Sequence, residues 1–272
     1  MVPIMTIVAC IITLLVSLVL PIIVLIIFAV KNKRQGIVTA WLLGAAGFFV
    51  TQILIRVPVL TFLQSQSWFV AFSNNNPFIY VFSLALTAGV FELAGRFTVA
   101  KLIKKKLTWK RSLAAGLGHG GIESILLTGV TYVNNLIYIF MINSGFFDIL
   151  IAQTSELGID LSQLELIKTQ LISIAPVMLI LAGLERLLAM TCHTAMSALV
   201  CYGVAYKKTG VCVLLCLVIH IIIDMTSGVS LVLPQNIAIP VIYTILTVMA
   251  VVSVVILKNI RRKMEFSPDT HI

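Results

Sequence analysis

Three pairs of ionisable residues lie four positions apart inside long apolar stretches of this sequence. The pairs are Glu92 and Arg96, His119 and Glu123, and His220 and Asp224. A further histidine, His193, also lies in an apolar stretch. Residues at positions i and i+4 share one face of a helix. A charged group at membrane depth is costly unless it is paired or faces water, so each of these residues is a candidate for function.

The chemistry that these side chains could perform together is the activation of water. A glutamate can take a proton from water, a neutral histidine can bind a metal or donate to an oxyanion, and an aspartate can orient an imidazole. Three histidines with a glutamate would also satisfy a tetrahedral zinc site. The patterns HExxH, GxSxG and GxxxxGK[ST] do not occur in the sequence, so serine-hydrolase and P-loop chemistry have no support from these motifs.

The composition indicates the kind of chain that carries these residues. It has 272 residues, of which 60% are hydrophobic and 11% charged, and a mean hydropathy of +1.11. A soluble domain is about 45–50% apolar and about 25% charged. We therefore expect an all-α, polytopic bundle of transmembrane helices that forms a single integral membrane domain over residues 1–272. The net charge of +9 comes from few cations in short loops, so we expect the lipid bilayer and no nucleic acid as a partner.

Seven apolar runs predict seven transmembrane spans, and one shorter run predicts an additional helix. The predicted spans are 4–30, 37–63, 78–100, 112–142, 187–206, 211–233 and 237–257. The shorter run, 171–184, is interrupted by Pro176 and Gly183, and we expect a re-entrant or interfacial helix there. The alternative is eight full spans.

Basic residues predict the orientation of these spans. They cluster at 31–34, 101–111, 207–208 and 258–263, whereas 64–77 is uncharged and 143–170 is mildly acidic. Because cytoplasmic loops carry the excess of Lys and Arg, we expect the N-terminus outside and the C-terminus inside, with a basic cytoplasmic tail at 258–272.

The candidate residues fall into one segment and one layer of the predicted bundle. The motif-bearing core covers about 78–235, so the first two spans, 4–63, are expected to be peripheral. At a rise of about 1.5 Å per residue the candidates occupy overlapping depths, and four helices could point them at one shared cavity. Glycines around His119 would let helices approach closely and would distort the helix. These glycines are Gly116, Gly118, Gly120 and Gly121.

Four motifs in order resemble a known family. They are FELAGR (91–96), GHGGIES (118–124), ERLLAMTCHTAMSALVCYGVAYKKTG (185–210) and HIIIDM (220–225). Together they resemble the YhfC-type predicted intramembrane metalloproteases, which are grouped with the PrsW-type proteases and the type II CAAX prenyl endopeptidases. The CAAX group has EExxxR, FxxxH and HxxxN/D on successive helices. Here Phe91 replaces the first glutamate and Ala189 replaces the phenylalanine.

The resemblance implies a peptidase that cleaves a membrane-associated protein or peptide in or near the membrane. It implies Glu92 as the base for water, although the missing double glutamate leaves Glu123 as the alternative base. Arg96 would fix the Glu92 carboxylate. The metal ligands or oxyanion donors would be His119, His193, His220 and Asp224. The metal would be Zn²⁺, and a metal-free glutamate mechanism is the alternative.

Two other classes of function stay open from the sequence. One is a non-catalytic membrane scaffold, because the scaffolding subunit of gamma-secretase is related to this group. The other is a proton-coupled transporter, in which acids and histidines relay protons. Transporters usually carry paired, broken-helix repeats, and no internal repeat is evident in this sequence.

Overall fold

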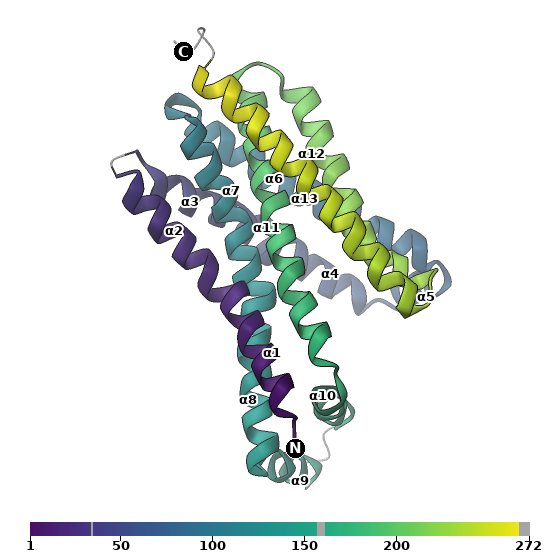
Figure 1. Ribbon diagram of the computed structural model, residues 1–272. Coiled ribbons are helices and arrows are strands. Elements are labelled where there is room, and N and C mark those ends of the chain that lie inside the picture. Colours follow the sequence, from purple (N-terminus) through teal and green to yellow (C-terminus); the bar gives the residue numbers. More distant parts are fainter. Residues whose placement is uncertain (34, 157–160, 267–272) are drawn as a thin grey trace. The chain divides into compact units, whose positions relative to one another are not determined.

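The computed structural model describes residues 1–33, 35–156 and 161–266, and the regular elements in this part of the chain are all helical (Figure 1). The last residues of the expected basic tail, 267–272, lie outside the described residues. In chain order the helices are α1 Ile4–Leu14, η1 Leu15–Val19, α2 Leu20–Lys31, α3 Ile37–Phe48, η2 Phe49–Arg56, α4 Val57–Gln64, α5 Ser67–Asn75, α6 Pro77–Ile103, η3 Lys104–Lys106, α7 Trp109–Glu123, η4 Ser124–Gly129, α8 Val130–Ser144, α9 Phe146–Glu156, α10 Ser162–Ser173, α11 Pro176–Ala205, α12 Thr209–Asp224, η5 Met225–Leu231 and α13 Gln235–Phe266.

Seven continuous helical segments of the described chain are long and apolar enough to cross a bilayer. They are Ile4–Lys31, Ile37–Gln64, Pro77–Lys106, Trp109–Ser144, Pro176–Ala205, Thr209–Leu231 and Gln235–Glu265. Each contains at least 18 residues, close to the roughly 20 residues that a helix needs to span the hydrocarbon core. The predicted polytopic all-α class and the count of seven spans are therefore confirmed. The orientation of the termini stays a prediction.

The boundaries around the fifth span differ from the sequence expectation. The run 171–184 is not a separate helix, because α10 ends at Ser173 and α11 begins at Pro176 and continues to Ala205. Proline is tolerated in the first turn of a helix, where its missing N–H would have no partner in any case. Pro176 therefore starts the fifth span instead of interrupting it. The short helices between spans four and five are α9 and α10.

The chain divides into two compact units, and the first consists of Met1–Ile23 and Ser124–Leu187. Within it α1 packs against α8, and a core of buried apolar residues includes Cys10, Ile139 and Phe147. The Thr13 hydroxyl donates a 2.6 Å hydrogen bond to the carbonyl oxygen of Leu179. This unit contains none of the ionisable site candidates.

The second unit consists of Val24–Glu123 and Leu188–Ile272, and it contains every candidate site residue. In it α3 packs along α6 and α7, and α12 packs against α6 and α13. Its core includes the buried side chains of Met196, Val200 and Cys216. The single domain expected from the sequence stays a prediction.

Candidate metal and catalytic site

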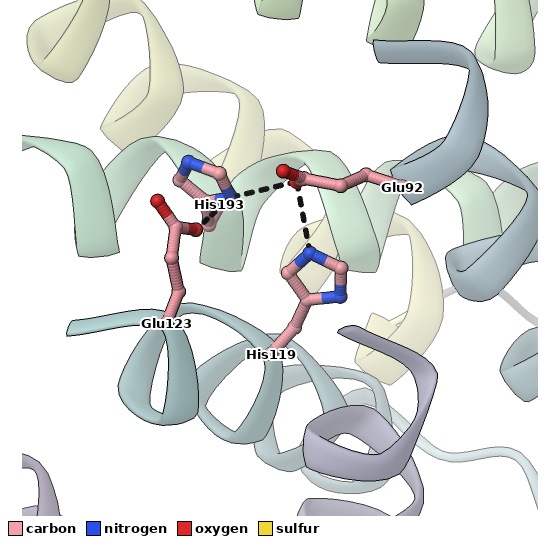
Figure 2. Close-up of side chains that lie close together, drawn as sticks. All are labelled: Glu92, His119, Glu123 and His193. Carbon is pink, nitrogen blue, oxygen red and sulfur yellow. Dashed lines mark hydrogen bonds and ion pairs between the residues drawn. The ribbon is translucent and has the colours of Figure 1, made fainter. Parts of the chain in front are cut away.

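Two glutamates and two histidines from three helices converge in the second unit. Glu92 lies on α6, His119 and Glu123 on α7, and His193 on α11. One potential ligand atom from each side chain lies within 4.8 Å of all the others. All four residues are at least nine-tenths buried. Figure 2 shows the two carboxylates and the two rings pointing toward one another.

The Glu92 carboxylate is the centre of this cluster. Its Oε2 lies 2.8 Å from Arg96 Nη2, 3.0 Å from His119 Nε2 and 3.4 Å from His193 Nδ1. His220 Nδ1 is 3.7 Å from the same oxygen. One oxygen atom is thus approached from α6, α7, α11 and α12. The four helices do direct their polar residues at one place, as expected from the similar depths.

The second carboxylate of the cluster, that of Glu123, contacts His193. Glu123 Oε2 lies 3.0 Å from His193 Nδ1 (Figure 2). His119 and Glu123 share a face of α7, as their spacing predicts, and each contacts a residue of another helix. The His119 and His193 rings are nearly parallel, with centroids 5.7 Å apart. A pattern that is local in sequence therefore becomes part of a site shared between helices.

The His220 and Asp224 pair lies at the edge of the cluster. His220 Nε2 is 3.2 Å from Asp224 Oδ2, so the predicted i, i+4 pair forms. The His220 ring is buried and lies edge-on to His193, with centroids 5.6 Å apart. The Asp224 side chain keeps 31% of its surface exposed. His220 is thus adjacent to the four converging residues, and its partner Asp224 is partly exposed.

Arg96 contacts both Glu92 and His193. Its Nη2 lies 2.8 Å from Glu92 Oε2 and 2.7 Å from His193 Nδ1. Its Nε and Nη1 are buried and have no hydrogen-bond partner in the described part of the chain. Beside them is a cavity of about 10 Å³ that is also lined by Ser197, whose buried hydroxyl likewise has no partner there.

Gln52 is a site residue that the sequence analysis missed. Its Nε2 donates to Glu92 Oε1 at 3.2 Å and to the Ala88 carbonyl oxygen at 3.1 Å. Arg56 donates in turn to Gln52 Oε1 at 3.2 Å and to the Leu84 carbonyl oxygen at 2.8 Å. The second span, expected to be peripheral, therefore supports the carboxylate at the centre of the site. The available signal was an amide in an apolar run, one helical turn before an arginine.

Glycines allow the helices that carry the site to approach closely. A Cβ atom on Gly118 would lie 2.0 Å from the Trp41 carbonyl oxygen of α3, and one on Gly44 would lie 1.9 Å from the Ala115 carbonyl oxygen of α7. A Cβ on Gly116 would lie 2.6 Å from the Thr194 carbonyl oxygen of α11. The expected close approach is thus confirmed. The helix remains α-helical through Glu123 and changes to a π-helix at Ser124, so the distortion follows the glycines.

The charges of the cluster favour a bound cation. Glu92 and Glu123 are both buried. Among the described residues, Arg96 is the permanent cation that contacts the cluster. Two carboxylates and one guanidinium leave one negative charge to be balanced in an environment where charge is costly. Uptake of one proton would balance that charge, and its negative sign would attract a divalent metal.

The donor atoms fit a zinc ion. Imidazole nitrogens and carboxylate oxygens bind zinc at about 2.0–2.2 Å, so neighbouring ligands of a tetrahedral site lie about 3.3–3.6 Å apart. The contacts of Glu92 Oε2 with His119 and His193 are 3.0 and 3.4 Å, and that of Glu123 with His193 is 3.0 Å. Two of these contacts are shorter than the ligand separations around a bound zinc ion, but one potential ligand atom of each of the four residues lies within 4.8 Å of the others. The residues present therefore match the group in donor type and lie close enough together to surround one ion.

Comparisons with known proteins identify the family of this chain. The model of the family described as YhfC intramembrane metalloprotease matches residues 16–247. A relative, the membrane protein YhfC of Bacillus subtilis (strain 168), is 32% identical over 180 residues, which cover 65% of this chain and 68% of the relative. No solved structure matches the chain significantly. The chain belongs to the YhfC intramembrane metalloprotease family.

Proposed function

We propose that this protein is an intramembrane metalloprotease of a bacterial plasma membrane that hydrolyses a peptide bond in or near the bilayer. Its substrate would be a membrane-associated protein or peptide. The observation that carries the proposal is the convergence of Glu92, His119, Glu123 and His193 within the second unit. A buried cluster of this composition is expensive as a purely structural device, and hydrolysis uses each of its groups.

The roles of the four residues follow from how each is held. Catalytic zinc sites commonly use three protein ligands and leave a fourth position open. We assign the three ligands to His119, His193 and Glu123. We assign the proton acceptor to Glu92, because Arg96 and Gln52 each donate a hydrogen bond to its carboxylate and fix its orientation. A zinc ion bound there would polarise the scissile carbonyl and make water more acidic.

The reaction then uses groups already positioned by the fold. Glu92 accepts a proton from the attacking water, and the oxygen of that water adds to the carbonyl carbon of the substrate. Glu92 later returns the proton to the leaving amine. The His220 ring is held by Asp224 at 3.2 Å and lies 3.7 Å from Glu92. A ring N–H of His220 can donate to the oxyanion that develops on the carbonyl oxygen.

Two measurements on one set of variants test this proposal. Elemental mass spectrometry of the purified protein should find zinc near one equivalent, lost in His119→Ala and His193→Ala and retained in Glu92→Gln. Sequencing of new protein N-termini in membranes of producing cells should find cleavage products with the wild type and none with Glu92→Gln. Glu165→Gln, an exposed carboxylate on α10, is the matched control and should behave as wild type in both.

Each measurement can contradict a different part of the proposal. Metal-free wild-type protein that still cleaves would reject the zinc assignment and leave a glutamate protease. Identical N-termini from the wild type and Glu92→Gln would reject hydrolysis by this site. If zinc were nevertheless bound in that case, the scaffold function would replace the protease.

A further inference from the structure

A large cavity lies away from the catalytic cluster, where several spans of the second unit end. Its volume is about 720 Å³, within the 300–1,000 Å³ range that is typical of ligand sites. It is lined by η3 at the end of the third span, by the first residues of α7, by the last residue of α11 with the tyrosine that follows it, and by the end of α13. The catalytic side chains are not among its lining residues.

The cavity is electropositive. Lys104, Lys105 and Lys110 line it from η3 and α7. The acidic residue in its lining, Glu265, accepts a 2.8 Å hydrogen bond from Arg261 Nε one turn earlier on α13, so its charge is already compensated. Three lysines at one cavity therefore attract an anion with several oxygen atoms, such as a phosphate group.

The rest of the lining is apolar or amphipathic. It includes the largely buried Trp109 ring, the Met264 side chain and the Tyr206 ring, which stacks on Tyr202 with centroids 4.7 Å apart. Partial burial, and then the neighbouring Tyr202, raise the pKa of Tyr206, whose phenol is a hydrogen-bond donor at neutral pH. A free inorganic phosphate would leave these apolar surfaces without a partner, whereas an amphiphile would cover them.

The depth of the cavity agrees with an amphiphile. Lys104 and Lys105 lie in the last turn of the span Pro77–Lys106, and Trp109 begins the span that follows. Ends of spans lie at the boundary between hydrocarbon and water, where Trp and Tyr gather and where lipid phosphates are found. We propose that this cavity binds the phosphate headgroup of an anionic phospholipid, with the lysines on the phosphate and the aromatic rings against the glycerol and upper acyl chain.

The test measures lipid binding to the full-length protein in detergent. Native mass spectrometry would be used with dioctanoyl phosphatidylglycerol, with dioctanoyl phosphatidylcholine and with inorganic phosphate. We expect the anionic lipid to bind at least tenfold more tightly than the zwitterionic one. The variant with Lys104→Gln, Lys105→Gln and Lys110→Gln should lose about fivefold in affinity per lysine, or roughly a hundredfold in total.

A matched control removes the same charge elsewhere. Lys33→Gln, Lys207→Gln and Lys258→Gln alter three exposed lysines that do not line the cavity. This control should stay within about threefold of the wild type, because separated exposed charges are screened. An equal loss in the control would overturn the proposal in favour of diffuse attraction to a basic surface. Inorganic phosphate binding as tightly as the anionic lipid would overturn it in favour of a soluble anion site.

Discussion

The substitution Gly118→Ala tests whether the close contact between α3 and α7 positions the site. The added Cβ would lie 2.0 Å from the Trp41 carbonyl oxygen, a backbone atom that cannot turn away as a side chain could. Cβ atoms essentially never approach a neighbour closer than 3.0 Å, so the two helices must separate by about 1 Å at this position. His119 is the next residue, and its Nε2 lies only 3.0 Å from Glu92 Oε2.

The substitution is expected to lower both the stability of the protein and the activity of the site. Overpacking of this kind costs about 1–3 kcal/mol, of which the helix preference of alanine over glycine returns at most about 1 kcal/mol. A shift of about 1 Å at a catalytic residue can lower the rate by about a hundredfold. We therefore expect Gly118→Ala to unfold at a lower temperature in detergent, to bind zinc more weakly and to cleave about a hundredfold more slowly.

Gly210→Ala is the control for the change of residue type. Gly210 lies in the first turn of α12, and a Cβ there would meet no atom within 4 Å. It should match the wild type in unfolding temperature, zinc content and cleavage. If Gly118→Ala did the same, the close approach of α3 and α7 and the placement of His119 derived from it would be wrong.

Three further predictions concern groups around the cluster. Gln52→Ala removes the donor to Glu92 Oε1, so cleavage should fall by about tenfold while the zinc content is unchanged; a loss of zinc would contradict the assignment of Glu92 as base instead of ligand. Asp224→Asn removes the negative charge beside His220 and should lower the maximal cleavage rate by at least about tenfold without changing zinc content, and an unchanged rate would exclude His220 as the oxyanion donor. Removal of the metal by a chelator should lower the unfolding temperature, and re-addition of zinc at about a hundred times its dissociation constant should restore about 2.7 kcal/mol of stability; insensitivity to both treatments would refute zinc binding.

Local patterns account for what could be predicted about the fold. The length and hydropathy of each apolar run depend only on consecutive residues, and they predicted an all-helical membrane protein with seven spans. The predicted start of the fifth span was wrong, because a proline such as Pro176 can either interrupt a helix or occupy its first turn. Which of the two applies depends on the conformation of the backbone before the proline.

Local sequence identifies most of the ionisable residues of the site but not the neutral residue that supports them. The spacing of four singled out Glu92, His119 and Glu123, because i, i+4 geometry is local, and residue type alone singled out His193, because a polar group is costly in any membrane helix. Gln52 was missed because a neutral amide is cheaper to bury and its significance comes from Glu92, forty residues away in sequence.

The partners across helices were decided by the tertiary structure alone. Three contacts connect different helices: that of His119 with Glu92, that of Glu123 with His193 and that of Arg96 with His193. Their distances depend on how closely the helices pack, and that is set where a glycine of one helix meets a backbone carbonyl of another. The sequence by itself determined which groups must find partners inside the membrane, and helix packing determined which partners they have.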